Sequence, residues 1–166
     1  AEKDWSDVSL SELIDHLEAT HHAYLRQAEP RLNSLLRKVV EAHGKNHPEL
    51  KELEHFVRDF WADMMPHLMK EERILFPKIR ELDALVVEEA SSSFIMGPIR
   101  VMRHEHDAVG HLLEQIRTIT NGYTAPADGC GTYRALMDEL KSLEIDTHLH
   151  IHKENNILFP KALASA

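Results

Sequence analysis

The sequence is short of the residues that mark several classes of protein. It contains one cysteine, Cys130, in 166 residues. An internal disulfide and a metal site built from several cysteines are therefore excluded. Only 6 glycines and 7 prolines are present. Because these residues punctuate turns, their scarcity favours long helices over a protein of short strands.

Basic residues and long apolar runs are scarce as well. The 19 lysines and arginines are outnumbered by 28 aspartates and glutamates, which gives a net charge of −9. A nucleic-acid or anionic membrane partner would need a basic surface, so neither is expected. No apolar run reaches the ~18–20 residues that span a membrane, and no signal-peptide pattern opens the sequence. We expect one domain over residues 1–166, located in the cytoplasm.

Histidine, by contrast, is abundant, with 13 residues, and two of them open a repeated segment. Residues 67–78 read HLMKEERILFPK, and residues 150–161 read HIHKENNILFPK. At an offset of 83 (150 − 67) the two segments share a histidine, a lysine, a glutamate and the whole ILFPK run. Such a match indicates an internal duplication of a two-helix unit.

Apolar residues recur at helical spacing in four segments, which predicts an all-α four-helix bundle. The expected helices run from Ser9 to Gly44, from Pro48 to Leu82, from Gly97 to Asn121, and from Thr132 through the second repeat. Ser9 and Glu12 have the spacing of a capping box, and Pro30 should kink or interrupt the first helix. The serines at 91–93 are expected to lie in a loop.

Several histidines and glutamates occupy positions in the apolar stripes that face the core. They are His67, Glu71, His106, His150 and Glu154, and two of the stripes continue beyond them to Ile74 and Ile157. Residues four apart share a helix face, so each repeat presents one imidazole and one carboxylate together. Buried polar groups cost free energy unless they are hydrogen-bonded or bound to metal. Two such pairs facing each other across a bundle predict a two-metal site.

The duplication predicts a further ligand in the first helix. His106 precedes His150 by 44 residues, so the counterpart of His106 should precede His67 by about the same distance. His22, which precedes His67 by 45 residues, fits this spacing. His21 instead continues the apolar stripe of the first helix, and periodicity alone does not separate the two neighbours. The repeat favours His22.

Most other histidines are expected to lie outside the site. Three of them stand two positions from a stripe residue and are therefore rotated roughly 200° away from it, at ~100° per residue. These are His104, His148 and His152. Three more have no counterpart in the other half and are expected on the surface, namely His16, His55 and His111.

His43 and Glu72 are also expected to have no ligand role. Along a continuous helix His43 would lie ~30 Å from His22, at ~1.5 Å per residue. Only a chain reversal near Pro30 would bring it into the site. Glu72 aligns with Asn155 in the second repeat, so its replacement is expected to change little.

Four imidazoles and two carboxylates suit iron, with zinc and manganese as substitutes. With Glu71 and Glu154 as bridges, each of two metal ions would have two histidine ligands. An added oxo or hydroxo bridge still leaves each ion short of six donors, so O₂, NO or peroxide could bind. A ferritin-like site would need Glu-x-x-His pairs on two helices. The pairs with that spacing here lie at unrelated places in the repeat.

These residues resemble the hemerythrin-like domain of the Repair of Iron Centres family, di-iron proteins linked to recovery of iron–sulfur clusters after nitric oxide or peroxide stress. The resemblance covers nearly the whole sequence: EKDW at the start, HH at 21–22, HGKNHPEL at 43–50, MKEERILFP at 69–77, GPI at 97–99, EHD at 105–107 and ENNILFP at 154–160. It implies that six residues take the metal-ligand positions, namely His22, His67, Glu71, His106, His150 and Glu154. The family pattern also has a histidine at position 43. Members commonly carry a small N-terminal domain with a cysteine pair, which this sequence does not contain.

The resemblance implies a di-iron protein that acts on damaged iron–sulfur proteins, by delivering iron from a labile site. Two other functions would use the same residues. One is binding or sensing of O₂ or NO, and the other is reduction of NO at the paired irons. Because all three use the same site, the sequence alone does not rank them.

Overall fold

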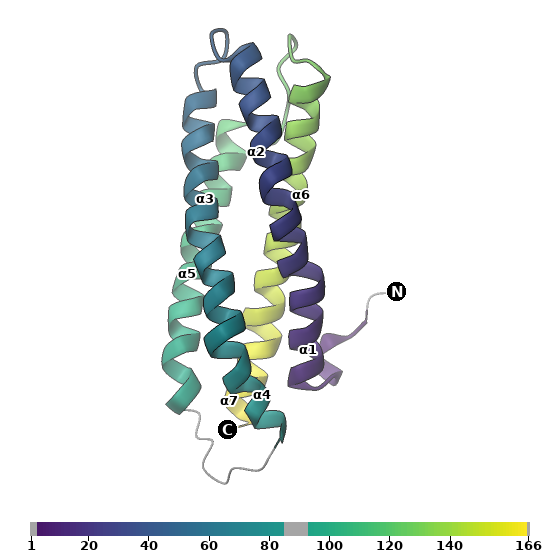
Figure 1. Cartoon of the computed structure of the whole chain (residues 1–166), viewed down its shortest axis with the longest axis vertical. Helices are drawn as coiled ribbons and strands as arrows, with labels where there is room; N and C mark the ends of the chain where they lie inside the picture. The colour runs from purple at the N-terminus through teal and green to yellow at the C-terminus, as the bar shows by residue number, and fades with distance from the viewer. Residues whose placement is uncertain (1–2, 85–92, 166) are drawn as a thin grey trace.

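A computed structural model describes residues 3–84 and 93–165, and all regular structure in these two ranges is helical. Four helical rods run alternately up and down along the long axis (Figure 1). The first consists of α1 (Leu10–His16), η2 (Leu17–His22) and α2 (Ala23–His43), and the second of α3 (Leu50–Lys70), η3 (Glu71–Leu75) and α4 (Phe76–Ala84). The third is α5 (Ser93–Ile119), and the fourth consists of α6 (Gly131–Lys153), η4 (Glu154–Leu158) and α7 (Phe159–Ala164). The prediction of an all-α four-helix bundle is confirmed.

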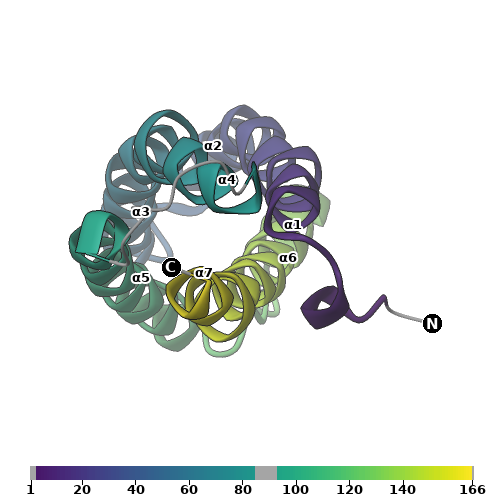
Figure 2. The ribbon, with the colours of Figure 1, turned by 90° about the horizontal axis from the view of Figure 1, so that it is seen from below.

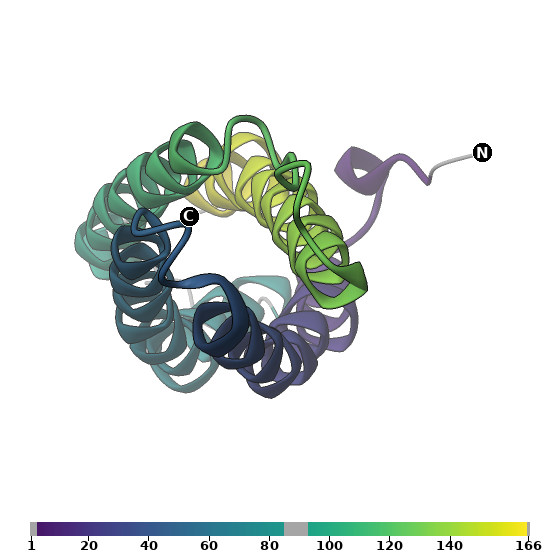
Figure 3. The same ribbon diagram turned by 90° about the horizontal axis from the view of Figure 1, so that it is seen from above.

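Seen along the axis, the rods form a ring (Figure 2 and Figure 3). In this ring α3 packs beside α2 and α5, and α6 packs beside the same two helices. A single turn of 3-10 helix, η1 (Trp5–Asp7), lies outside the ring beside α1 (Figure 2). Within the described ranges, no helix combines the length and the apolar character needed to cross a membrane.

Local sequence accounts for several of the helix ends. The Ser9 side chain accepts a hydrogen bond from the Glu12 backbone N–H, as the capping-box spacing predicts. Helix α2 ends directly before Gly44. Helix α5 ends shortly before Asn121 and Gly122, whose φ angles of 50° and 71° lie in the left-handed region and turn the chain out of the helix.

Helices continue through Pro30, Pro66 and Pro98. Helix α2 is not interrupted at Pro30, and α5 begins at Ser93, so the predicted start at Gly97-Pro98 is wrong. Ile95 and Ile99, on either side of that dipeptide, are both buried. Their packing holds the chain in a helical path across the proline, because tertiary contacts supply most of the stability of a helix.

The start of the fourth rod also differs slightly from the prediction. Helix α6 begins at Gly131, and Cys130 rather than Thr132 occupies the N-cap position. Of the serines expected in a loop, Ser91 and Ser92 lie outside the described residues, and Ser93 is the first residue of α5.

Two apolar clusters fill the interior of the bundle. One extends toward the α2–α3 connection and includes Leu36, Phe60, Leu113 and Leu140, whereas the other extends toward the opposite end and includes Leu13, Phe76, Ile99 and Phe159. In each rod, the histidine or glutamate of the predicted site falls at the boundary between the residues of the two clusters. The candidate site is therefore a polar layer between two apolar layers.

Three of the rods contain a π-helical turn at this polar layer. The turn η2 ends at His22, η3 begins at Glu71, and η4 begins at Glu154. In η3 the Phe76 N–H donates to the carbonyl of Glu71, five residues back, and in η4 the Phe159 N–H donates likewise to Glu154. Each turn thus contains one residue more than an α-helical turn, which is frequent at functional sites.

The extra residue shifts the inward face of the helix and corrects two predictions. Ile74 was expected in the buried stripe but is 49% exposed, and Ile157 is only partly buried. Leu75 and Leu158, the next residues, are buried in their place. A constant period of 3.6 residues therefore fails after each glutamate of the repeat.

Candidate metal centre

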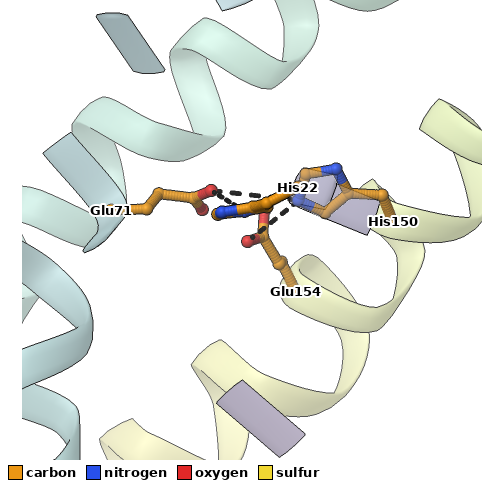
Figure 4. Close-up of side chains that lie close together, drawn as sticks. All are labelled: His22, Glu71, His150 and Glu154. Atoms are coloured by element: carbon orange, nitrogen blue, oxygen red, sulfur yellow. Dashed lines mark ion pairs between the residues drawn. The ribbon is translucent and has the colours of Figure 1, made fainter. Parts of the chain in front are cut away.

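Six side chains from all four rods converge in the polar layer. They form two groups of four that could each hold a metal ion: His22, Glu71, His150 and Glu154 in one, and His67, Glu71, His106 and Glu154 in the other. Within each group the candidate ligand atoms lie within 4.8 Å of one another. All six side chains are buried. The first group appears in Figure 4, where the two carboxylates approach the imidazoles from different helices.

Glu154 directs its two oxygens to different groups. Its Oε1 lies 2.9 Å from Nε2 of His106, and its Oε2 lies 3.3 Å from Nε2 of His150. Burial acts to raise the pKa of Glu154, but His150, Glu71 and His106 outweigh it and hold that pKa well below its usual range. This carboxylate is therefore an anion that reaches both groups.

Glu71 also lies between the two groups. Its Oε1 is 3.2 Å from Nε2 of His22, 3.4 Å from Nε2 of His67 and 3.8 Å from Nε2 of His150. Burial and the neighbouring Glu154 raise the pKa of Glu71 well above its usual range. Without a cation, two carboxylates this close do not both ionise readily.

The His22 ring is held from outside by a charged pair. Its Nδ1 lies 2.7 Å from Oε2 of Glu72. Both Nη atoms of Arg26 donate to the same carboxylate, each at 2.8 Å. Burial acts to raise the pKa of Glu72, but Arg26 and His22 lower it on balance, so Glu72 accepts as an anion. The repeat predicts no role for Glu72, whereas the structure places it in direct contact with the site.

The other two outer contacts hold the rings of the second group. Nδ1 of His67 lies 2.8 Å from Oε1 of Glu105, and Lys70 donates to the other oxygen of that carboxylate. Nδ1 of His106 lies 2.8 Å from Oδ1 of Asn155. Such outer partners fix the orientation of a metal-binding imidazole and raise its basicity.

The hydrogen bonds at Nδ1 decide which ring nitrogen faces the interior. Because each partner is an oxygen acceptor, Nδ1 carries the proton and Nε2 presents a lone pair inward. Among the described residues, Nε2 of His22, Nε2 of His150 and both oxygens of Glu71 and of Glu154 have no hydrogen-bond donor, although all are buried. Converging buried acceptors without donors are costly unless a cation satisfies them. The residues therefore fit a metal site, and imidazoles with carboxylates suit iron.

The protonation of the rings also suits metal binding. Burial lowers the pKa of His22 and that of His67 to about 4, so both rings are neutral at pH 7. For His106, burial acts to lower the pKa, but the adjacent Glu154 carboxylate outweighs it and raises the pKa. Histidine ligands must be neutral to bind, so two of these rings compete little with protons near neutrality.

The structure separates the neighbours His21 and His22. His22 faces the site, whereas the ring nitrogens of His21 contact Asp146 at 3.0 Å and Lys153 at 2.9 Å. In the turn η2, the residue above Leu17 on the same face is five positions later rather than four. That residue is His22, so the structure places the histidine that the repeat favours at the candidate site and turns His21 toward Asp146 and Lys153.

Five of the histidines expected outside the site are exposed, namely His55, His104, His111, His148 and His152. His16 is different, because it is partly buried rather than a surface residue. Its ring stacks on Trp5 with 3.7 Å between the centroids, and its Nε2 lies 2.8 Å from Nζ of Lys153. The N-terminal segment covers it, which no repeat or periodicity indicates.

His43 lies at the end of α2, far along the bundle from the candidate site. Its Nε2 is 3.2 Å from Sγ of Cys130, and its ring packs edge-on against Tyr133. Because α2 does not reverse at Pro30, the ~30 Å expected along a straight helix still separates His43 from His22.

Sequence reasoning missed the outer contacts made by Glu72, Glu105 and Asn155. Glu72 and Asn155 follow the two repeat glutamates and are equivalent under the offset of 83 (155 − 72). A search for identities between the repeats passes over this position, since the residues differ. Both can accept a hydrogen bond from a ring N–H, and that shared chemistry is the signal that could have identified them.

Known proteins similar to this chain point to the same kind of site. Residues 12–162 match the family described as the hemerythrin HHE cation binding domain. Proteins named iron–sulfur cluster repair protein YtfE, from Escherichia coli O157:H7 and Enterobacter sp. (strain 638), are each 39% identical to this chain over 163 residues. The alignments cover 98% of this chain and 70% of each relative. Together with the buried histidines and glutamates, the family supports iron binding. The chain belongs to the hemerythrin HHE cation binding domain family and, within it, to the family of iron–sulfur cluster repair proteins.

Proposed function

We propose that the six converging side chains bind two iron ions. Glu71 and Glu154 would bridge the ions, each ion would take two imidazoles, and an oxo or hydroxo bridge would complete the pair. The support is the set of buried acceptor atoms that face one another without donors. When bound, the iron pair supplies redox chemistry and open coordination positions for small diatomic molecules such as O₂ and NO.

The pair serves the repair of iron–sulfur clusters damaged by nitric oxide or oxidative stress, and the protein delivers iron to damaged iron–sulfur proteins in the cytoplasm. The single observation that carries this function is the name of the relatives, iron–sulfur cluster repair protein, at 39% identity over nearly the whole chain. The ligand set is consistent with delivery, because it contains no cysteine thiolate, a ligand that favours iron held in clusters.

The chain's own residues prepare the site for binding and release. Burial keeps His22 and His67 neutral, so their lone pairs are available without the prior loss of a proton. Glu72 and Arg26 form a hydrogen-bonded link from the buried His22 ring to the surface, where 45% of the Arg26 side chain is exposed. A substitution of Arg26 at the surface can therefore affect the buried His22 ring through two successive hydrogen-bonded contacts.

Iron transfer is tested directly with protein loaded with ⁵⁷Fe. The loaded protein is mixed with an iron–sulfur enzyme whose cluster has been damaged by NO, and Mössbauer spectroscopy follows the label. We expect ⁵⁷Fe to enter the cluster of the target as its activity returns. A ferrous ⁵⁷Fe salt, with enough chelator to bind free ions, is the control for simple leakage.

An NO-turnover assay on the same preparation separates the alternatives. Catalytic loss of NO without transfer of label would support a di-iron NO reductase and overturn delivery. Stoichiometric binding of NO or O₂ without transfer would support a sensor. His111→Ala, which alters an exposed histidine, should behave like the parent protein in every arm.

A further inference from the structure

The two groups of candidate ligands are not supported equally. The rings of His67 and His106 both have hydrogen bonds at Nδ1, to Glu105 and Asn155 respectively. In the other group His22 has such a bond, but Nδ1 of His150 has no hydrogen-bond partner among the described residues, although that ring is buried. One group therefore has two anchored imidazoles, and the other has one.

A ring stack takes the place of the missing hydrogen bond. The imidazole of His21 lies parallel to that of His150, with 5.3 Å between centroids and 9° between planes. Both nitrogens of His21 have other partners, since Nδ1 contacts Asp146 and Nε2 contacts Lys153. His21 thus limits the movement of the His150 ring but does not accept its proton.

The duplication places this difference at one position. His22 precedes its counterpart His106 by 84 residues (106 − 22), and His21 precedes Glu105 by the same 84 residues. Glu105 is the carboxylate that holds His67, and His67 is the counterpart of His150. One repeat therefore has an acceptor for the ring N–H, and the other has a stacking imidazole at the equivalent position.

We propose that the iron between His22 and His150 is the weakly held ion and the one that leaves first. This inference rests on the proposed di-iron site. An acceptor at Nδ1 fixes the ring and makes its Nε2 a stronger donor to metal, and loss of such a partner typically costs roughly 10–100-fold in affinity. Because Nδ1 of His150 has no such acceptor among the described residues, the two ions have unequal affinities.

Extraction by a chelator tests the inequality. The iron-loaded protein should release one iron quickly and the second on the order of 10–100 times more slowly. Crystals of the half-extracted protein, examined by anomalous diffraction at the iron edge, should retain iron between His67 and His106. Equal occupancy of the two positions, or iron retained only between His22 and His150, would overturn the proposal.

Variants of the outer contacts give a second measurement that does not depend on crystals. Glu105→Ala and Asn155→Ala remove the anchors of the slow ion and should accelerate its release toward the fast rate. Glu72→Ala should accelerate only the fast phase. Asn156→Ala is the matched control, because Asn156 is exposed and its side chain hydrogen-bonds to His152, which is also exposed. A slow phase unchanged in Glu105→Ala and Asn155→Ala, with helical content intact, would also overturn the proposal.

The test of unequal iron release does not depend on whether the protein repairs clusters. If two equally held ions still reach a damaged cluster, the proposed function stands and the inequality fails. If one ion is released first but never enters a cluster, the inequality stands and delivery fails. A protein that binds one iron or none would remove the basis of both.

Discussion

His67 and His106 point their Nε2 atoms at each other across 3.1 Å, inside the buried layer of the bundle. Each ring donates its Nδ1 proton outward, His67 to Glu105 and His106 to Asn155. The two inner nitrogens therefore bring lone pairs together, and one of them must take a proton unless a cation lies between them. Burial acts to lower the pKa of His106, but the Glu154 carboxylate raises it on balance, so the His106 ring takes up a proton more readily than a free imidazole does.

From this geometry we predict two irons per chain in an oxo- or hydroxo-bridged ferric pair. The two groups of ligand atoms share both carboxylates, which would place the ions close enough to couple magnetically. Iron analysis with Mössbauer spectroscopy of the purified, loaded protein provides the measurement. One iron per chain, or two irons without coupling, would contradict the site as proposed.

Neighbouring histidines in the fourth rod should differ in their effect on iron. His150→Ala removes a candidate ligand and should lower the iron content from two per chain to one or fewer. His148→Ala and His152→Ala should leave it near two, because both side chains are exposed. Iron retained in the first variant and lost from the other two would mean that the fourth rod presents a different face.

The two glutamates of the repeat should respond alike to loss of charge. Glu71→Gln and Glu154→Gln keep the size of the side chain but remove the anion that offsets the charge of both ions. We expect weaker retention of iron and loss of magnetic coupling in each variant. The circular dichroism spectrum should stay helical, because the apolar clusters supply most of the burial in the bundle.

The matched control for these two variants is Glu114→Gln. Glu114 is exposed on α5, away from both candidate groups. Its replacement should leave iron content and coupling as in the parent protein. If the control lost iron while Glu71→Gln kept a coupled pair, the carboxylates would not be bridges.

Much of the bundle could be predicted because helical period and duplication act over long stretches. The capping pair Ser9 and Glu12, the buried stripe and the convergence of the repeat residues all follow from spacing. The π-helical turns could not be predicted, since they depend on packing at the polar layer and not on a local residue preference. These turns account for the exposure of Ile74 and for the position of His22, rather than His21, in the candidate site.

The hydrogen bonds to Nδ1 of the histidine rings could not be predicted from residue spacing, for a different reason. Glu72 stands beside a candidate ligand on its helix, but its partner His22 comes from another rod, 50 residues away in sequence. Such a contact depends on how rods are rotated against each other, which a repeat does not encode. We therefore expect Glu72→Gln to weaken iron retention, in contrast to the prediction from the repeat.

The size of that effect should be moderate. The side-chain amide introduced by Glu72→Gln could still accept the His22 ring proton, but the charged pair with Arg26 would be lost. We therefore expect up to roughly 10-fold weaker iron binding, at the low end for an outer partner. Competition with a chelator of known affinity provides the measurement. Binding unchanged in Glu72→Gln and also in Arg26→Ala would show that this charged pair does not support the site.

The last prediction concerns the opposite end of the bundle, where Cys130 meets His43. The thiol is exposed, and its Sγ lies 3.2 Å from Nε2 of His43. This hydrogen bond, together with backbone N–H groups of Tyr133 and Thr132 at the start of α6, lowers the pKa of Cys130 from 9.0 to about 7. A helix N-terminus favours the anion in the same direction.

Because the thiolate is the reactive form, alkylation of Cys130 by iodoacetamide should rise with pH about a midpoint near 7 and level off above it. At neutral pH about half of the thiol would be ionised, whereas a thiol with a pKa of 9.0 would be about 1% ionised. His43→Ala removes the hydrogen bond that lowers the pKa most, so the midpoint should move upward, toward 9.0. His55→Ala, at an exposed histidine on α3, should leave it near 7. Mass spectrometry of the labelled protein across pH 5–10 gives both curves, and a parent midpoint near 9, or one that His43→Ala does not move, would show that the imidazole does not activate this thiol.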